Sequence, residues 1–198
     1  MDKNDVRLVL GMTVYDSVTP ETMISVFVAL RQLTCPVQLN VCKGTIISNL
    51  RNQIIESSIQ LGATHVMFVD SDISFPAEGI ETLLSRGKDI IGGMYNTKEI
   101  PSHLTIKVLD PDGNILVGTH DFQIPKEPFK CHAVPTGFML VRLEAIKNMK
   151  YPFDFGRTEQ GDFVSEDINF CERAQKELGL EVWCDPTIPI GHIGPYMY

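Results

Sequence analysis

The sequence has no concentration of positive charge. Its 17 Lys and Arg residues are outnumbered by 25 Asp and Glu residues, which gives a formal net charge of −8. Nucleic-acid binding needs clustered Lys and Arg side chains to meet phosphates, and the sequence contains no basic run. The composition therefore argues against nucleic acid as the main partner. An anionic ligand would have to be bound locally, by a metal ion, a helix end or one or two basic residues.

The sequence also lacks the patterns of disulfide-rich and membrane-spanning proteins. It has five cysteines and no Cys-x-x-Cys spacing, so neither a disulfide framework nor a zinc knuckle is indicated. No stretch reaches the roughly 18 apolar residues that a membrane span needs. The first residues do not have the pattern of a signal peptide. We expect reduced thiols in a cytoplasmic protein.

Strand and helix patterns alternate over the first half of the chain. Short apolar runs rich in β-branched residues predict strands, and apolar residues at helical spacing predict the helices between them. This alternation is typical of right-handed β-α-β units, so the predicted fold class is α/β, with a Rossmann-like, mostly parallel central sheet flanked by helices. The predicted strands span 6–14, 36–42, 65–70 and 89–95, and the predicted helices span 17–33, 46–62 and 76–87.

The second half of the chain has a different pattern. The turn sequence of residues 110–113, Asp-Pro-Asp-Gly, predicts a small antiparallel hairpin. The glycine and polar content of residues 152–164 predicts a mobile loop. This loop is either a lid over a ligand or a plain surface loop. An amphipathic helix is predicted at 165–179 and a last strand at 180–185. With 198 residues and no linker, we expect a single domain spanning 1–198.

Two aspartates end the third predicted strand. Asp70 and Asp72 lie on either side of Ser71, at the carboxyl edge of the sheet, where ligands of open α/β folds gather. Two neighbouring carboxylates repel each other, and a divalent ion such as Mg²⁺ or Mn²⁺ would resolve that conflict. The alternative is structural, because both residues could cap the loop and the helix that starts near Pro76.

Four further residues are candidates for the same site. Arg51, on the helix before the aspartates, could reach a phosphate or a nucleobase, or it could be a solvated helix residue. Glu166 and Asp167 lie in the first turn of a predicted helix, where acidic residues are also favoured by the helix dipole. His192 lies between glycines in Gly-His-Ile-Gly, as a metal ligand or as a hydrogen-bonded surface histidine.

Taken in order, these stretches resemble nucleotide-diphospho-sugar glycosyltransferases of the GT-A type. The pattern is similar to the family-2 enzymes and to small viral and bacterial proteins related to them. The resemblance extends over nearly the whole chain from about residue 44. It is carried by ISNLRNQII, HVMFVDSDISFP, KDIIGGMY, VPTGFMLVR, SEDINFCERAQKELGLEVWCDP and GHIG.

The resemblance implies a role for each matching residue. Asp70 would contact the ribose and help to hold the metal, and Asp72 and His192 would ligate it directly. Asp167 would be the catalytic base, and Glu166 would bind the acceptor or the sugar. The remaining roles concern the two substrates. Thr13 and Tyr15 would contact the base of the donor, and Arg51 would face its nucleotide or diphosphate. Ser71, between the two aspartates, would also contact the donor. Gly92, Gly93 and Tyr95 would line the donor sugar, and Thr136 and Gly137 would lie near the acceptor.

The resemblance further implies a division of the domain and a reaction. Residues 1–99 would bind the nucleotide sugar, and residues 100–198 would bind the acceptor and carry out catalysis. Many relatives have an acidic residue after the second strand to bind uracil, whereas this chain has Asn-Val-Cys-Lys-Gly there. A UDP-sugar is favoured as the donor from the resemblance alone. The little sequence after His192 leaves open that the chain is a catalytic module of a larger protein.

The expected function is therefore metal-dependent transfer of a sugar from a nucleotide-diphosphate sugar to a glycan or another hydroxyl acceptor. With Asp167 as general base, the transfer would invert the anomeric centre. Two alternatives remain at this point. One is a phosphatase similar to haloacid dehalogenases, with Asp70 as nucleophile. The other is a module that binds nucleotide sugars or glycans without catalysis. The Glu166–Asp167 pair and the segment around His192 favour glycosyl transfer, because neither alternative requires them.

Overall fold

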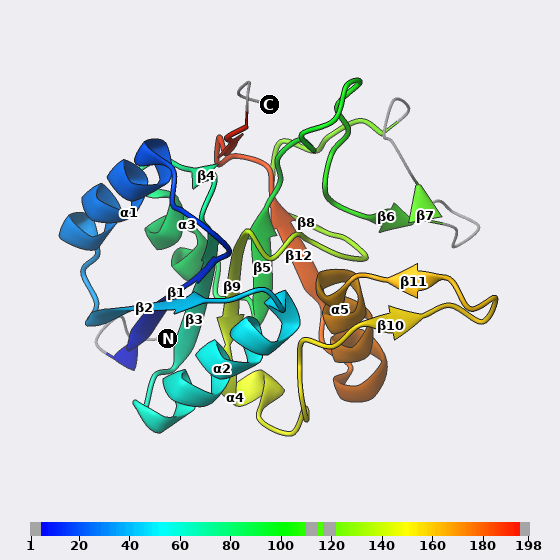
Figure 1. Cartoon of the computed structure of the whole chain (residues 1–198), viewed down its shortest axis with the longest axis horizontal. Coiled ribbons are helices and arrows are strands. Elements are labelled where there is room, and N and C mark those ends of the chain that lie inside the picture. Colours follow the sequence, from blue (N-terminus) through cyan, green and yellow to red (C-terminus); the bar gives the residue numbers. More distant parts are fainter. Residues whose placement is uncertain (1–4, 110–114, 117–121, 195–198) are drawn as a thin grey trace.

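A seven-stranded sheet forms the centre of the molecule (Figure 1). The computed structural model describes residues 5–109, 115–116 and 122–194. The strand order across the sheet is β2-β1-β3-β9-β5-β12-β8. In chain order, these strands are β1 (Leu8–Val14), β2 (Val37–Lys43), β3 (His65–Asp70), β5 (Ile90–Gly93), β8 (Phe129–Lys130), β9 (Phe138–Arg142) and β12 (Val182–Asp185).

The sheet is mostly parallel, which confirms the predicted fold class. Strands β1, β2, β3, β5 and β12 point in one direction, whereas β9 and β8 run against them. The antiparallel direction of β9 was not predicted. Its run Phe-Met-Leu-Val is buried throughout, and a continuous apolar run indicates burial on both faces but carries no information about direction.

Helices cover both faces of the sheet, as the alternating pattern predicted. On one face, α1 (Pro20–Gln32) and α3 (Gly79–Ser85) pack against strand residues such as Leu10 and Val69. On the other face, α2 (Ile47–Gln60), α4 (Leu143–Ile146) and α5 (Glu166–Leu178) pack against residues such as Phe68 and Met139. Neighbouring residues of β3 therefore belong to different cores, because successive side chains of a strand point to opposite faces.

Within the described part of the chain, three short two-stranded sheets lie outside the central sheet. Residues 156–164, within the predicted loop of 152–164, contain a hairpin that projects from the body in Figure 1. The predicted hairpin near residue 110 is also present, although its turn residues 110–114 lie outside the described residues. The pairs are β4 (Ile73–Ser74) with β13 (Gly191–His192), β6 (Val108–Leu109) with β7 (Ile115–Leu116), and β10 (Gly156–Arg157) with β11 (Phe163–Val164).

Two helix starts illustrate where local sequence signals hold and where they do not. Helix α1 begins at Pro20 after Thr19, whose hydroxyl accepts a hydrogen bond from the Thr22 amide at 3.3 Å. Helix α3 begins at Gly79 and not at the predicted Pro76, because a turn with a 2.9 Å hydrogen bond from the Gly79 amide to the Pro76 carbonyl precedes it. Among the described residues, no helix has the length and apolarity to cross a membrane.

The topology brings distant segments to the carboxyl edge of the sheet. Strands β1 and β3 end side by side there, with Thr13 opposite Asp70. The pairing of His192 with Ile73 places the end of the chain next to the loop that follows β3. Strands from residues 100–198 pair with strands from residues 1–99, so the two predicted halves share one sheet. This edge contains most of the residues that the sequence singled out.

Candidate active site at the carboxyl edge of the sheet

Asp70 is held by two partners at the end of β3. The hydroxyl of Thr13 donates a hydrogen bond to Asp70 Oδ1 at 3.0 Å. Arg51 Nη2, from helix α2, lies 3.3 Å from each carboxylate oxygen of Asp70. Both oxygens therefore have protein partners, which fixes the orientation of the carboxylate.

Arg51 joins Asp70 to the first turn of helix α5. Its side chain is only 4% exposed, and its Nη1 donates to Glu166 Oε1. Burial alone lowers the pKa of Arg51, but the carboxylates of Asp70 and Glu166 raise it more, so the guanidinium stays charged. Burial raises the pKa of Glu166, and Arg51 opposes that rise. The predicted contact of Arg51 with a nucleotide stays a prediction, because this structure directs the guanidinium at two carboxylates.

Asp72 and His192 face each other across the same edge. Asp72 Oδ1 lies 3.8 Å from His192 Nε2, and His192 Nδ1 lies 2.8 Å from the carbonyl oxygen of Asn96. Because a carbonyl can only accept, Nδ1 carries a proton, and Nε2 faces Asp72. The ring of Tyr95 packs edge-on against the imidazole at a centroid distance of 5.0 Å. These contacts fix the orientation of the imidazole.

The Asp72–His192 pair fits a Mg²⁺ or Mn²⁺ ion as two of its ligands. Ligand atoms about 2.1 Å from one ion can lie at most about 4.2 Å apart, and the 3.8 Å between Asp72 Oδ1 and His192 Nε2 meets that limit. The described residues contain no group of three or more His, Cys, Asp or Glu side chains placed to hold a metal. Asp70 does not join the pair because it binds Arg51 and Thr13. Its predicted part in metal binding stays a prediction.

A cavity of about 170 Å³ adjoins these residues. It opens where β1, β2 and β3 end, which is the expected place for a ligand in an open α/β sheet. Five residues predicted from the sequence to bind the donor line it together with residues of the β2–α2 connection. The five are Thr13, Tyr15, Asp70, Ser71 and Asp72.

Asp167 lies in the first turn of α5, next to Glu166. Its Oδ1 accepts hydrogen bonds from the Ser165 hydroxyl and from the Ile168 amide, the latter at 2.8 Å. Ser165 thus binds the Asp167 side chain and makes no side-chain cap hydrogen bond to α5. No described residue donates a hydrogen bond to Asp167 Oδ2. The Glu166 carboxylate, in contrast, is buried and paired with Arg51.

The predicted sugar and acceptor residues are mostly buried beneath this edge. A Cβ atom on Gly93 would lie 2.0 Å from Ile190 Cδ1, and one on Gly137 would lie 2.2 Å from the Tyr95 hydroxyl. Gly92 is similarly enclosed, with the Phe138 carbonyl 2.9 Å from such an atom. Packing therefore explains these glycines without a ligand, and their predicted substrate contacts stay predictions. Thr136 is 1% exposed, and its hydroxyl has no partner among the described residues.

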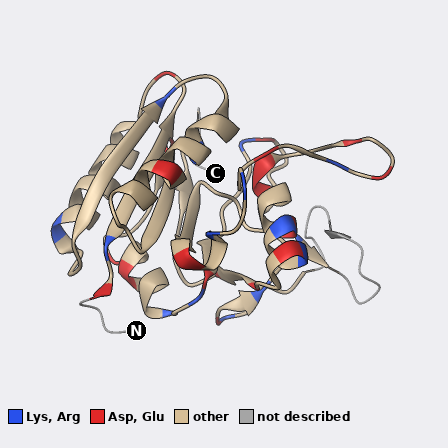
Figure 2. Cartoon of the chain, turned by 90° about the horizontal axis from the view of Figure 1, so that it is seen from below, with Lys and Arg blue, Asp and Glu red and all other residues tan. Residues whose placement is uncertain are grey.

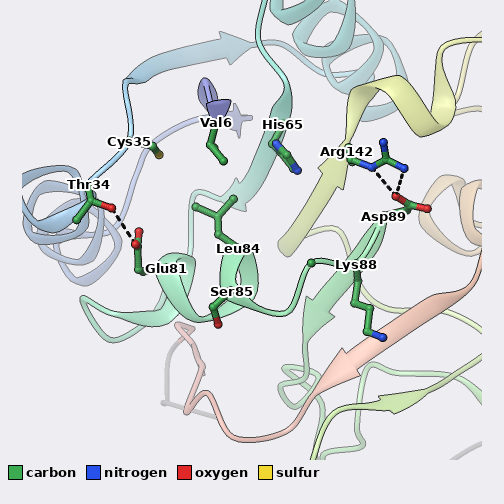
Figure 3. Close-up of a pocket in the computed structure, with 11 residues that line it drawn as sticks. Val6, Thr34, Cys35, His65, Glu81, Leu84, Ser85, Lys88, Asp89 and Arg142 are labelled. Atoms are coloured by element: carbon green, nitrogen blue, oxygen red, sulfur yellow. Dashed lines mark hydrogen bonds and ion pairs between the residues drawn. The ribbon is translucent and has the colours of Figure 1, made fainter. Parts of the chain in front are cut away.

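A larger cavity, of about 490 Å³, lies at the opposite edge of the sheet (Figure 3). The charged side chains that line it interact with neighbouring residues. Arg142 binds Asp89, and the Thr34 hydroxyl donates to Glu81 at 2.9 Å. Lys88 extends over the ring of Trp183, with its Nζ atom 3.6 Å from the ring centroid. The pairing of these groups favours the smaller cavity at the carboxyl edge as the reaction site.

His65, which lines the larger cavity, should make the folding stability of the protein depend on pH. Burial first, and then the nearby Arg142, lower its pKa from 6.5 to about 4. Between these values the unfolded chain binds a proton that the folded chain does not, so stability falls as the pH falls from 6.5 toward 4. At about 1.4 kcal/mol per pKa unit, His65 should remove about 2 kcal/mol of folding free energy between pH 7 and pH 4.5.

Urea unfolding of the wild type and of His65→Gln at both pH values measures this contribution. The variant should lose less stability on acidification than the wild type by about the stated 2 kcal/mol. Equal losses in the two proteins would show that His65 is not the group responsible.

Two residues near the site were not identified from the sequence. Lys98 forms an ion pair with Asp72 Oδ2, and Asn96 supplies the carbonyl that orients His192. Both lie in the loop after β5. Its position at the carboxyl end of a buried strand was the only available signal. The Asn96 contact uses the backbone, so the residue type at that position carried no information about it.

The chain has a mixed α/β fold with its candidate site at the carboxyl edge of the sheet. Among solved structures, A197 from STIV is similar, with a TM-score of 0.62 and 13% identity over 96% of this chain and 86% of that chain. A protein from Desulfovibrio desulfuricans G20 described as a nucleotide-diphospho-sugar transferase has a TM-score of 0.50 and 10% identity over 91% of this chain and 80% of that chain. At these identities the likeness shows the fold alone. No family model and no curated protein matches the sequence.

Proposed function

We propose that this chain transfers a sugar from a nucleotide-diphosphate sugar, preferably a UDP-sugar, to a hydroxyl acceptor. The observation that carries the proposal is the facing pair of Asp72 Oδ1 and His192 Nε2, 3.8 Å apart beside the cavity at the carboxyl edge. The Asn96 carbonyl holds the ring so that Nε2 faces the Asp72 carboxylate, and a divalent ion could bind between these two atoms.

The donor nucleotide would occupy the cavity at the ends of β1, β2 and β3. Thr13 and Tyr15 would contact the base, and Asp70, held rigid by Arg51, would accept a hydrogen bond from the ribose. Asp72 and His192 would hold Mn²⁺ or Mg²⁺, which would act as a Lewis acid for the negative charge that develops on the diphosphate. In Figure 2 the Lys and Arg residues of the described part of the chain are scattered over several elements.

Asp167 would remove the proton from the acceptor hydroxyl. The acceptor oxygen forms a bond to the anomeric carbon as the bond to the diphosphate oxygen breaks, and the proton passes to Asp167 Oδ2. A single displacement of this kind inverts the anomeric centre. The phosphatase alternative requires Asp70 to act as a nucleophile. The structure argues against this role, because both oxygens of Asp70 are bound by Arg51 and one is also bound by Thr13. A phospho-aspartate trapped on Asp70 would favour that alternative.

Thermal unfolding with nucleotide sugars tests the proposal. A ligand present at about 100 times its Kd stabilises the folded state by about 2.7 kcal/mol, which raises Tm by roughly 5–10 °C for a chain of this size. We expect this shift with a UDP-sugar and Mn²⁺ together and a much smaller one without Mn²⁺. Asp72→Asn should abolish the metal-dependent part.

The alternatives predict different outcomes. A shift of the same size with and without Mn²⁺ in the wild type would contradict the metal-dependent assignment. Donor binding with no sugar transfer and no slow donor hydrolysis, measured by chromatography of released UDP, would identify a binding module in place of an enzyme.

A further inference from the structure

Asp72 is shared between His192 and a lysine. One of its oxygens, Oδ1, faces His192 Nε2 at 3.8 Å, and the other, Oδ2, binds the ammonium group of Lys98. The same short loop after β5 supplies both Lys98 and the Asn96 carbonyl that fixes the imidazole. This loop therefore orients His192 toward one oxygen of Asp72 and supplies the ammonium group that pairs with the other oxygen.

Lys98 changes the charge that a metal ion would meet. Asp72 supplies the carboxylate of the proposed metal site, and the Lys98 ammonium offsets its negative charge. An ammonium bound to the same carboxylate repels a divalent ion, and the repulsion is only partly screened because both side chains are 32% exposed. The ion alone should consequently bind weakly.

A diphosphate group would remove this conflict. Its oxygens add negative charge beside Asp72 and are among the usual ligands of Mg²⁺ and Mn²⁺ in nucleotide sites. They also offer the Lys98 ammonium a second anion within reach of its flexible side chain. Asp72 lines the cavity in which the donor is proposed to bind, so the diphosphate, the metal and Lys98 would meet at this carboxylate.

We propose that Lys98 couples metal binding to nucleotide binding, so that the divalent ion is retained only together with a nucleoside diphosphate. The proposal rests on the proposed function, because it uses the same metal site. A surface ion pair with no such role would contribute little to stability and would leave metal affinity unchanged. The two interpretations therefore differ in a measurable way.

The test is the affinity for Mn²⁺, measured by electron paramagnetic resonance of the free ion, with and without UDP. In the wild type, UDP should tighten Mn²⁺ binding well beyond the affinity of UDP alone for Mn²⁺. Lys98→Met should tighten Mn²⁺ binding in the absence of UDP by about tenfold, the size expected when one like charge leaves a partly exposed site. The gain caused by UDP should shrink by about the same factor, because the variant already binds Mn²⁺ more tightly without UDP, and by linkage Mn²⁺ should then promote UDP binding less as well.

Lys130→Met is the matched control, because Lys130 also forms an ion pair with a carboxylate, that of Glu181, on the surface. It should leave both Mn²⁺ affinities unchanged. If UDP promotes Mn²⁺ binding equally in the wild type and in Lys98→Met, the coupling role of Lys98 is wrong while the proposed function stands. If the wild type binds no Mn²⁺ even with UDP, the proposed metal site itself is wrong, and the coupling fails with it.

Discussion

Asp167→Asn should lower the rate of sugar transfer by about a hundredfold to ten-thousandfold, the range typical for loss of a general base. The amide is nearly the same size as the carboxylate but cannot accept the acceptor proton. Its oxygen can keep the hydrogen bonds from Ser165 and Ile168, so the first turn of α5 should remain intact. Nucleotide affinity should change little, because Asp167 does not line the cavity at the ends of β1, β2 and β3.

Initial rates with a UDP-sugar, together with calorimetry of UDP and Mn²⁺ binding, measure the two effects separately. Asp162→Asn is the control, because Asp162 is an exposed aspartate on the nearby β10–β11 hairpin. It should leave both quantities unchanged. Turnover of Asp167→Asn within a few-fold of the wild type would remove Asp167 from the role of base.

Arg51→Met should cause the largest loss of stability, of about 3–5 kcal/mol, because it leaves the buried carboxylate of Glu166 and the partly buried carboxylate of Asp70 without their cation. The expected fall in Tm is roughly 10 °C for a chain of this size. Activity should fall in the remaining folded protein as well. Asp70 would lose its orientation, and the first turn of α5 would lose its link to α2.

Chemical denaturation of Arg51→Met, of Arg31→Met and of the double variant Arg51→Met with Glu166→Gln separates the causes. Arg31 is an exposed arginine of α1, and its replacement should cost less than about 1 kcal/mol. The double variant should be more stable than Arg51→Met alone, because it buries one fewer unpaired charge. A loss below about 1 kcal/mol for Arg51→Met would contradict the role of this buried network.

The sequence predicted the place of the site better than its internal contacts. Alternating strand and helix patterns identified the carboxyl edge of the sheet, and Asp70 and Asp72 are found there together with Thr13 and His192. Arg51 was correctly placed on the helix before β3, but its burial was not foreseen. Its partner Glu166 lies 115 positions further along the chain, and helical periodicity gives no information about such a distant contact.

The same limit explains the other differences. Periodicity reports which side chains are buried, so it could not show that β9 runs against its neighbours β3 and β5. The resemblance assigns Gly92 and Gly93 to the donor sugar, and that role stays a prediction; in the structure they leave room for Val134 and Ile190. Lys98 was missed because a single lysine in a loop carries no sequence signal for a contact with a distant residue such as Asp72.

The most direct test of the account is a crystal structure with Mn²⁺ and UDP, with anomalous data collected at the manganese edge. The account predicts an anomalous peak coordinated by Asp72 and His192 Nε2 and by oxygens of the diphosphate, with the uracil near Thr13 and Tyr15. A structure with UDP bound but with manganese elsewhere, or with His192 making no contact with the ion, would contradict it.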